Sequence, residues 1–445
     1  MGNLYRLFSF ISVFLCFQVC YAQKAFSPAE LIADIDSVNR KIIELHPHPF
    51  SIIDSTTYFE EVKAVKEKIG TPLSADAFHK LITPLIAKIG DGHTGIVPDQ
   101  SLMSISKLRF PFDVFIKDRK LFITENYSSD KNIPLGSEIL KINGIPADEI
   151  LYTLLKHSPG ELTDYKTAVI ESLFPMVYKS IYGEFDEFSV EIKEPDTIKT
   201  YKIDTIVNAV QNMPEFMKPS ELHFKDNVAV IDLRNFSAHD FNSFIHSAFL
   251  QISEKKCESL IIDLRNNVGG HSMYADSLIS YLTDKEYQSM VSDSIKISFA
   301  TSPYIEQLQK MGLGSRNGDI YSWNGIPVQP VEREHAFRGS LYILTGPITY
   351  STAAFAANVT KCYKMGTVVG AETGQPMIAY GDTHIYTLPN TNLLCGISKQ
   401  KFVFCCAEKD AVGVVPDYKV ERNLKDILDK KDTVMEFTLG LINNN

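Results

Sequence analysis

Cysteine and tryptophan are scarce in this sequence, and several patterns that mark common protein classes are missing. The 445 residues include seven cysteines and one tryptophan, and no two cysteines have the Cys-x-x-Cys spacing typical of zinc or iron–sulfur sites. We therefore expect no metal centre. The five cysteines beyond residue 22 are interpreted as core residues, and whether two of them form a disulfide is left open.

Long apolar runs and an excess of positive charge are also absent after the N-terminal segment. No later stretch of about 18 apolar residues occurs, so we expect no stable membrane span. The chain has 44 Lys and Arg against 54 Asp and Glu, and its net charge of −10 argues against a nucleic-acid partner. The patterns GxSxG, HExxH and GxxxxGK[ST] do not occur, so hydride or phosphoryl transfer has no support and no cofactor is expected.

The N-terminus has the pattern of a secretory signal peptide. Arg6 precedes an apolar run over residues 7–20, and Ala22 is a small residue at a suitable cleavage point before Gln23. We expect residues 1–22 to be removed on export. The remaining chain would then act in the periplasm or outside the cell, and its length suits two or three domains.

The first part of this remaining chain is expected to be helical. Apolar residues recur every three or four positions over residues 27–90, and Ser27-Pro28 is a typical helix start. We assign residues 23–100 to a small helical domain that ends with the turn GDGHT at 90–94.

The second part has the alternation of strands. Apolar and polar side chains alternate within residues 107–205, with a turn at Asn143-Gly144 and a hairpin-like pair around residues 195–196. We assign residues 101–210 to a β-rich binding or regulatory domain, in which no titratable cluster is evident.

The third part alternates strands with helices, which argues for an α/β domain with a largely parallel sheet. We assign residues 211–445 to it. A polar, Gly-containing insert at about 286–337 interrupts the alternation and is placed as a lid or rim. The predicted strands are residues 228–232, 259–263, 340–344 and 366–370.

Ser351 is the first candidate for chemistry. It stands where a strand and a turn lead into an alanine-rich helix. Backbone N–H groups are unpaired at a helix N-terminus, and acyl transfer needs such donors around the oxyanion that forms. Two interpretations fit this position: a serine nucleophile, or a serine that only caps the helix.

Two Gly-containing turns supply further candidates. His93 directly follows Asp91-Gly92 and so projects from a tight turn, although many loop histidines have no function. The segment NNVGG at 266–270 follows an apolar strand, and its paired glycines let a ligand approach backbone N–H groups. A plain connection between strand and helix is the alternative for this segment.

Together these segments resemble the superfamily of tail-specific (C-terminal processing) and tricorn-like serine peptidases. The resemblance covers nearly all of the chain after residue 22 and implies a crotonase-like ββα core beside a PDZ-like domain. Its motifs follow the family's order: IGDGHT at 89–94, KINGIPADEI at 141–150, IIDLRNNVGG at 261–270, TYSTAAFAANV at 349–359, VVGAETG at 368–374 and GVVPDYKV at 413–420.

Carried over to this sequence, the resemblance implies that Ser351 is the nucleophile and that the N–H groups of Gly269 and Thr352 form the oxyanion hole. Family members with a Ser/Lys dyad have the lysine shortly after the strand that follows the nucleophile's helix. Here Gln375 or Pro376 occupies that place, and neither accepts a proton usefully. The resemblance therefore favours the branch that uses a histidine.

In that branch the base comes from an earlier segment, and His93 matches it. Tricorn-like members have a serine directly before this histidine, where the present chain has Gly92. The branch also has an acid that orients the histidine. Asp410 fits the spacing best and Glu408 is the family's residue type, so both stay open, while Glu372 is interpreted as a rim residue.

The resemblance thus implies an exported serine peptidase that cuts unfolded proteins or peptides through an acyl-enzyme. The alternative is a catalytically decayed member that binds peptides or a hydrophobic ligand. The distance between the Ser351 and His93 side chains distinguishes the two interpretations. The sequence does not indicate an oligomeric state.

Overall fold

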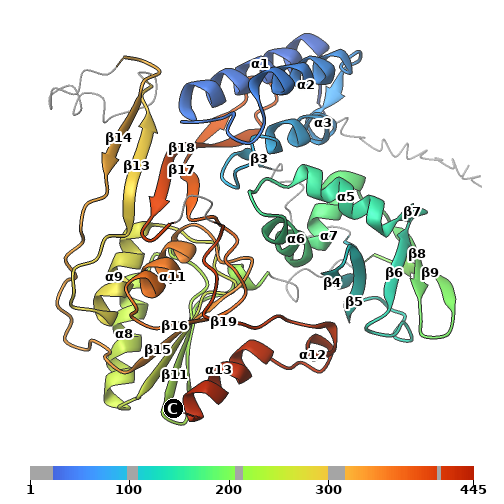
Figure 1. The fold of residues 1–445 in the computed structure, drawn as a ribbon. Coiled ribbons are helices and arrows are strands. Elements are labelled where there is room, and N and C mark those ends of the chain that lie inside the picture. Colours follow the sequence, from blue (N-terminus) through green and yellow to red (C-terminus); the bar gives the residue numbers. More distant parts are fainter. Residues whose placement is uncertain (1–23, 98–108, 206–213, 299–315, 408–411, 445) are drawn as a thin grey trace, which may run out of the picture.

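The computed structural model describes residues 24–97, 109–205, 214–298, 316–407 and 412–444. The predicted signal peptide lies outside these residues. Among the helices that are described, none has both the length and the apolar character needed to cross a membrane. Figure 1 shows helices at the N-terminus, a mixed region beside them, and a larger α/β region that contains the C-terminus.

The N-terminal region is helical, as predicted. It contains α1 (Pro28–Leu45), α2 (Ser55–Glu67) and α3 (Ala75–Ala87), with the short pair β1 (Ala25–Phe26) and β2 (Leu73–Ser74). Ser27 and Glu30 form a capping box at the start of α1, in which each side chain accepts from the other's backbone N–H. The three helices share one hydrophobic core with residues 388–397 from the far end of the chain.

The middle region combines a sheet with three helices. The predicted hairpin is present, since β8 and β9 pair across residues 194–197. Its strands are β4 (Phe112–Lys117), β5 (Lys120–Asn126), β6 (Glu138–Ile142), β7 (Ile145–Pro146), β8 (Glu187–Lys193) and β9 (Ile198–Asp204). Its helices are α5 (Ala147–His157), α6 (Thr163–Ser172) and α7 (Phe174–Tyr182).

The sequence did not predict α6 and α7. Ile170 is the one fully buried residue of α6, so this helix lacks the wide apolar stripe by which a surface helix is recognised. The α6 helix nevertheless has a positional role, because the loop that enters it carries a residue of the candidate site.

The α/β region is built on a six-stranded sheet, and the predicted α/β class is confirmed. Its strands, in spatial order, are β10 (Glu221–Lys225), β11 (Val228–Asp232), β12 (Ser259–Asp263), β15 (Ser340–Thr345), β16 (Thr367–Gly370) and β19 (Tyr418–Lys419). All neighbours from β11 to β19 are parallel, and β10 is antiparallel at the edge.

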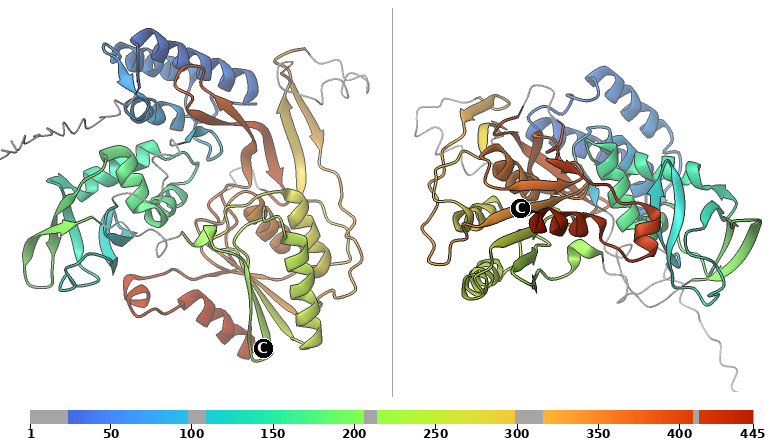
Figure 2. Two further views of the ribbon diagram at one scale, coloured as in Figure 1. Left: turned by 180° about the vertical axis from the view of Figure 1, so that it is seen from behind. Right: turned by 60° about the horizontal axis from the view of Figure 1, so that its bottom comes forward.

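Helices cover both faces of this sheet (Figure 2). One apolar core lies under α8 (Phe241–Glu254), α9 (Ser272–Leu282) and α11 (Thr352–Cys362), and a smaller one lies under α13 (Thr433–Asn443). The short α12 (Leu424–Leu428) contacts β5 of the middle region. Because the strands are parallel, their C-terminal ends share one edge, where the β12 and β15 connections meet.

A second sheet brings the GDGHT turn to this edge. It has the order β14 (Ile320–Asn324), β13 (Met290–Lys296), β18 (Leu394–Phe404) and β17 (Ile378–Thr387), and β3 (Gly95–Val97) also pairs with β18. The predicted insert at about 286–337, placed as a lid or rim, contains β13 and β14, which pair with each other and extend this sheet.

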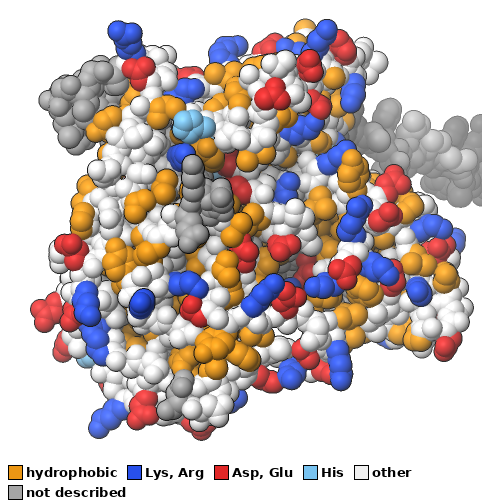
Figure 3. All heavy atoms as spheres, in the orientation of Figure 1, with side chains coloured by type: hydrophobic (Ala, Val, Ile, Leu, Met, Phe, Trp, Pro, Cys, Tyr) orange, Lys and Arg blue, Asp and Glu red, His pale blue; other side chains and the backbone are white. Residues whose placement is uncertain are grey.

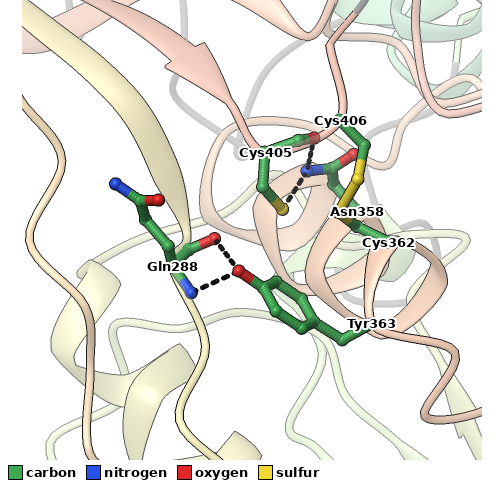
Figure 4. The surroundings of a disulfide bond; sticks show 6 residues. All are labelled: Gln288, Asn358, Cys362, Tyr363, Cys405 and Cys406. Carbon is green, nitrogen blue, oxygen red and sulfur yellow. Dashed lines mark hydrogen bonds between the residues drawn. A yellow bond between two sulfur atoms is a disulfide. The ribbon is translucent and has the colours of Figure 1, made fainter.

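A disulfide joins the end of α11 to the end of β18. Cys362 bonds Cys406, while Cys405 stays free and buried and accepts from the Asn358 amide through its carbonyl and its sulfur (Figure 4). The neighbouring Tyr363 hydroxyl accepts from the Gln288 N–H at 2.7 Å. The C-terminal end of α11 is thus fixed to two other segments.

Candidate active site

Ser351 lies at the N-terminal end of α11 in a strained backbone conformation. Its φ is +52° and its ψ is −126°, a combination that residues with a side chain rarely adopt. Its side chain makes no capping hydrogen bond, so the interpretation as a simple helix cap is wrong. The hydroxyl instead lies within hydrogen-bond distance of the His93 ring.

The NNVGG segment holds the turn that carries Ser351. The Tyr350 N–H donates to the Asn267 carbonyl at 3.0 Å, and the Asn267 amide donates to Leu233 at 2.8 Å. A side chain on Gly269 would collide with the Ser351 Cβ and the Thr352 nitrogen. Glycine is therefore required there, because the two turns are in direct contact.

His93 lies opposite Ser351. Its Nε2 is 3.2 Å from the Ser351 Oγ, although 258 positions separate the two residues in the sequence. The pairing of β3 with β18 brings the histidine turn to this place. The ring also packs against Tyr350, with centroids 5.1 Å apart, and lies close to Gly381.

Asp91 fixes the conformation of the histidine turn. This aspartate is 1% exposed, and its Oδ1 accepts from the backbone N–H groups of His93 and Thr94 at 2.8 and 2.9 Å and from the Ser398 hydroxyl at 2.8 Å. Its Oδ2 lies 3.0 Å from the His46 Nε2. Because the His46 Nδ1 accepts from the His48 N–H, Nε2 carries the proton and donates to Asp91.

Gly92 packs directly beneath Tyr350. A Cβ at position 92 would overlap the Tyr350 hydroxyl, so a serine in this position would require Tyr350 to move. The Tyr350 hydroxyl instead donates to the Glu161 carboxyl group at 2.7 Å, and its ring stacks on Tyr165 at 4.3 Å.

Glu161 is a residue of the site that the sequence analysis did not single out, because no titratable cluster marks the middle part of the chain. It lies in the loop between α5 and α6, and no motif in the sequence marks it. Its Oε1 is enclosed and has no hydrogen bond within the described residues. Burial, together with the charge of Asp91, raises the pKa of Glu161 to about 8.

The surroundings of His93 favour its neutral form. Burial lowers the pKa of the imidazole, and the charge of Asp91 and the backbone of Tyr380 oppose this effect only in part. A neutral imidazole can accept the proton of a serine hydroxyl, whereas an imidazolium cannot. The pair is thus suited to nucleophilic catalysis at neutral pH.

The two backbone N–H groups predicted to form the oxyanion hole differ in whether they already donate a hydrogen bond. Of the described hydrogen bonds, none has the Thr352 N–H as its donor, and this group opens α11 next to Ser351. The Gly269 N–H, in contrast, donates to the Asn267 Oδ1 at 2.8 Å. An oxyanion would have to replace Asn267 as the acceptor of this hydrogen bond.

Asp410 and Glu408, the two candidates for the acid, lie outside the described residues. Glu372, interpreted as a rim residue, accepts from the Gly413 N–H at 2.8 Å. Gln375, at the place of the dyad lysine, is buried, and its Oε1 has no hydrogen bond among the described residues. Where the structure describes the chain, no three His, Cys, Asp or Glu side chains are arranged to hold a metal ion.

Comparisons with known proteins agree with this geometry. Residues 227–420 match the family description "Peptidase family S41". The structure of mature CPAF in complex with lactacystin is similar, with a TM-score of 0.69 and 15% identity over 94% of this chain and 99% of that one. A candidate peptidase from Parabacteroides merdae has a TM-score of 0.51 and 15% identity over 94% of this chain and 96% of its own. No curated protein matches the sequence significantly.

The family match, the fold and the short distance between His93 and Ser351 all support a serine peptidase. A decayed binding protein would have no need for a strained serine within reach of a neutral histidine. Residues 227–420 therefore form the α/β core of a serine-type peptidase and match peptidase family S41.

Proposed function

We propose that this chain is an exported serine peptidase that hydrolyses peptide bonds of unfolded proteins or peptides, with Ser351 as nucleophile and His93 as general base. The observation that carries the proposal is the 3.2 Å separation of the His93 Nε2 and the Ser351 Oγ, combined with the strained backbone of Ser351. A hydroxyl and a neutral imidazole in this geometry are the two partners that serine acyl transfer needs.

The reaction follows from these positions. His93 removes the hydroxyl proton as Ser351 attacks the peptide carbonyl, and the Thr352 N–H stabilises the oxyanion. Gly269 supplies the second donor when its N–H gives up the hydrogen bond to the Asn267 side chain and donates to the oxyanion. His93 then protonates the leaving amine, and water releases the acyl group from Ser351.

An acid that orients His93 completes the proposed machinery. The family resemblance assigns this role to Asp410 or Glu408. The Nδ1 of His93 is enclosed, and the Tyr380 backbone close to the ring forms no hydrogen bond of normal geometry with it, so Nδ1 can still donate to a carboxylate partner. Such a carboxylate would fix the tautomer that leaves Nε2 free to accept the serine proton.

Export has two independent supports. The first 22 residues have the charge and apolar pattern of a signal peptide. The Cys362–Cys406 disulfide is of a kind that persists in oxidising compartments and is rare in the cytosol. The middle region, which resembles PDZ-like domains, suits binding of an extended peptide segment.

The test is hydrolysis of a denatured, fluorescently labelled protein by the mature chain and two variants. Ser351→Ala should lower the rate by at least about 10³-fold, because the residue that forms the acyl-enzyme is lost. Ser340→Ala, an exposed serine of the strand that leads to the same turn, is the matched control and should be fully active. Equal hydrolysis by the Ser351 variant and the wild type would refute the assignment.

A further inference from the structure

Glu161 lies between the two turns that carry the candidate catalytic residues. Its Oε2 accepts from the hydroxyl of Tyr350, the residue directly before Ser351, at 2.7 Å. Gly92, the residue directly before His93, packs against the same hydroxyl. The Glu161 carboxyl group thus belongs to a connected group of contacts that adjoins both the nucleophile and the base.

Three aromatic rings connect the region around Glu161 to the base. Tyr165 of α6 stacks on Tyr350 with ring centroids 4.3 Å apart, and Tyr350 packs on the His93 ring at 5.1 Å. Tyr350 is buried, so its orientation is determined by these neighbours. A change in the orientation of the Tyr350 ring would therefore act directly on the His93 ring.

The hydrogen bond to Glu161 fixes the outer end of the Tyr350 side chain. Among the hydrogen bonds of the described residues, it is the only one that the Tyr350 hydroxyl makes. Removing the acceptor would leave a buried hydroxyl unpaired, which costs free energy unless the ring moves to another partner. We therefore expect the loss of Glu161 to displace the ring that packs on His93.

The surroundings of Glu161 favour a neutral carboxyl group. Its Oε1 is enclosed, although the residue as a whole is partly exposed. Burial raises the pKa of this group, and the negative charge of Asp91 in the histidine turn raises it further. An ionised Glu161 would add a second negative charge close to the turn where the oxyanion forms. Like charges repel, so ionisation would disfavour that intermediate.

The other titratable groups around Glu161 keep their charge near neutral pH. The tyrosines stay neutral because burial raises their pKa. Although burial opposes it, hydrogen bonding to His46 lowers the pKa of Asp91, which stays ionised. The groups that interact with Glu161 are Asp91 of the histidine turn, Tyr350 of the nucleophile turn, Tyr165 and Lys166 of α6, and Tyr380 of β17.

We propose that Glu161 is a positioning residue of the active site, which holds the nucleophile turn and the histidine turn in their catalytic arrangement through Tyr350. It acts as a neutral hydrogen-bond acceptor and takes no part in proton transfer to the substrate. The inference rests on the proposed peptidase function and adds a residue of the middle region to its machinery.

The first experiment measures hydrolysis of a peptide without titratable groups at pH 7, with kcat given per folded molecule from circular dichroism. Glu161→Ala and Tyr350→Phe each remove the hydrogen bond. Each should lower kcat about tenfold or more and leave KM nearly unchanged, because misplaced reacting groups slow the chemical step. Glu161→Gln keeps an oxygen acceptor for the tyrosine and should recover most of the kcat that Glu161→Ala loses.

The second experiment is the alkaline side of the pH profile, which a merely structural role would not change. Wild-type kcat/KM should fall as pH rises through about 8, because Glu161 becomes charged. Glu161→Gln cannot ionise and should lack this fall. Asp164→Asn, an exposed residue in the first turn of α6, is the matched control and should keep both the wild-type kcat and the alkaline fall.

Three results would each overturn the proposal. The first is a wild-type kcat in Glu161→Ala or Tyr350→Phe, which would mean that the hydrogen bond does not position the site. The second is a Glu161→Gln variant as slow as Glu161→Ala. The third is an identical alkaline profile for the wild type and Glu161→Gln.

A fluorescent fluorophosphonate, which reacts with activated serines, separates this inference from the peptidase function. Labelling of Ser351 that slows in Glu161→Ala and recovers in Glu161→Gln supports the positioning role even if no peptide is cut, which would refute only the peptidase function. Hydrolysis and labelling at wild-type rates in Glu161→Ala refute only the positioning role. A wild-type protein that neither reacts with the probe nor cuts the peptide refutes both.

Discussion

Gly92 illustrates how one residue of the site depends on its neighbours. Where tricorn-like members have a serine, this chain has glycine, because the Tyr350 hydroxyl fills the place of the side chain. That hydroxyl is held by Glu161 on its far side. The substitution at position 92 is therefore matched by a tyrosine–glutamate pair, and it does not indicate a decayed site.

The protonation of His93 leads to a prediction on pH. Its pKa is lowered from the ordinary value of 6.5, first of all by burial, so the neutral base should persist into mildly acidic solution. We expect kcat/KM to stay constant from neutral pH downward and to fall only below pH 6.5. A peptide without titratable groups is the substrate, so that the profile reports on the free enzyme.

Two outcomes would contradict this prediction. A fall of kcat/KM that is half complete at or above pH 6.5 would mean that Asp91 outweighs burial. The absence of any fall down to about pH 4 would mean that His93 does not act as the base.

At the scale of the elements, the sequence predicted the central strands well. β11 and β12 lie at the predicted residues, and β15 and β16 begin or end within one residue of prediction. These elements are buried, so their apolar patterns are strong. The helix α6 and the hairpin of β13 and β14 were not recognised, because few of their residues face a core.

The disulfide at the end of α11 leads to a prediction on stability. It closes a loop of 44 residues, and the entropy model of cross-links gives about 4 kcal/mol for a loop of that length. We expect the double variant Cys362→Ser, Cys406→Ser to lose about 2 to 4 kcal/mol of unfolding free energy, measured by denaturant titration. Adding a reductant to the wild type should cause a similar loss.

Cys257→Ser is the matched control for this experiment. Cys257 is a free, half-buried thiol, and its replacement should leave the effect of the reductant intact. If the double variant is as stable as the wild type, the bond contributes nothing to the folded state.

The whole molecule brings the site together from segments that are far apart in the sequence. His93 comes from the turn before β3, Ser351 from the core, and Glu161 from the loop before α6. The sequence predicted the first two because each stands in a turn with a recognisable pattern. It did not predict Glu161 or the role of Asp91, since their partners are set by the packing of distant segments and leave no local signal.

Charges of both signs are mixed on the visible face of the molecule (Figure 3). On the face drawn in Figure 3, acidic and basic side chains are interspersed over all regions, and no large patch of one sign is visible. Electrostatic attraction over long distances is thus a weak source of selectivity on this face.

Glu161 joins the middle region to the nucleophile, and its ionisation leads to the last prediction. Its pKa is raised from 4.5 to about 8, so between these values the folded state binds the proton and the unfolded state does not. The slope of unfolding free energy against pH is then negative. The stability that the neutral carboxyl contributes is complete below about pH 4.5 and is lost as pH rises through about 8.

The variant Glu161→Gln keeps the shape of the neutral side chain and cannot ionise. Its unfolding free energy should rise relative to wild type as pH increases from 5 to 8, by at most about 1.4 kcal/mol per pH unit. Denaturant titrations at several pH values measure this difference in unfolding free energy, in which the titratable groups shared by both proteins cancel. Glu149 is an exposed residue of α5, and the variant Glu149→Gln controls for the loss of one negative charge. A difference that stays constant or shrinks with pH would mean that Glu161 is already ionised in the folded protein. The hydrogen bond between the Glu161 carboxylate and the Tyr350 hydroxyl would then persist at high pH.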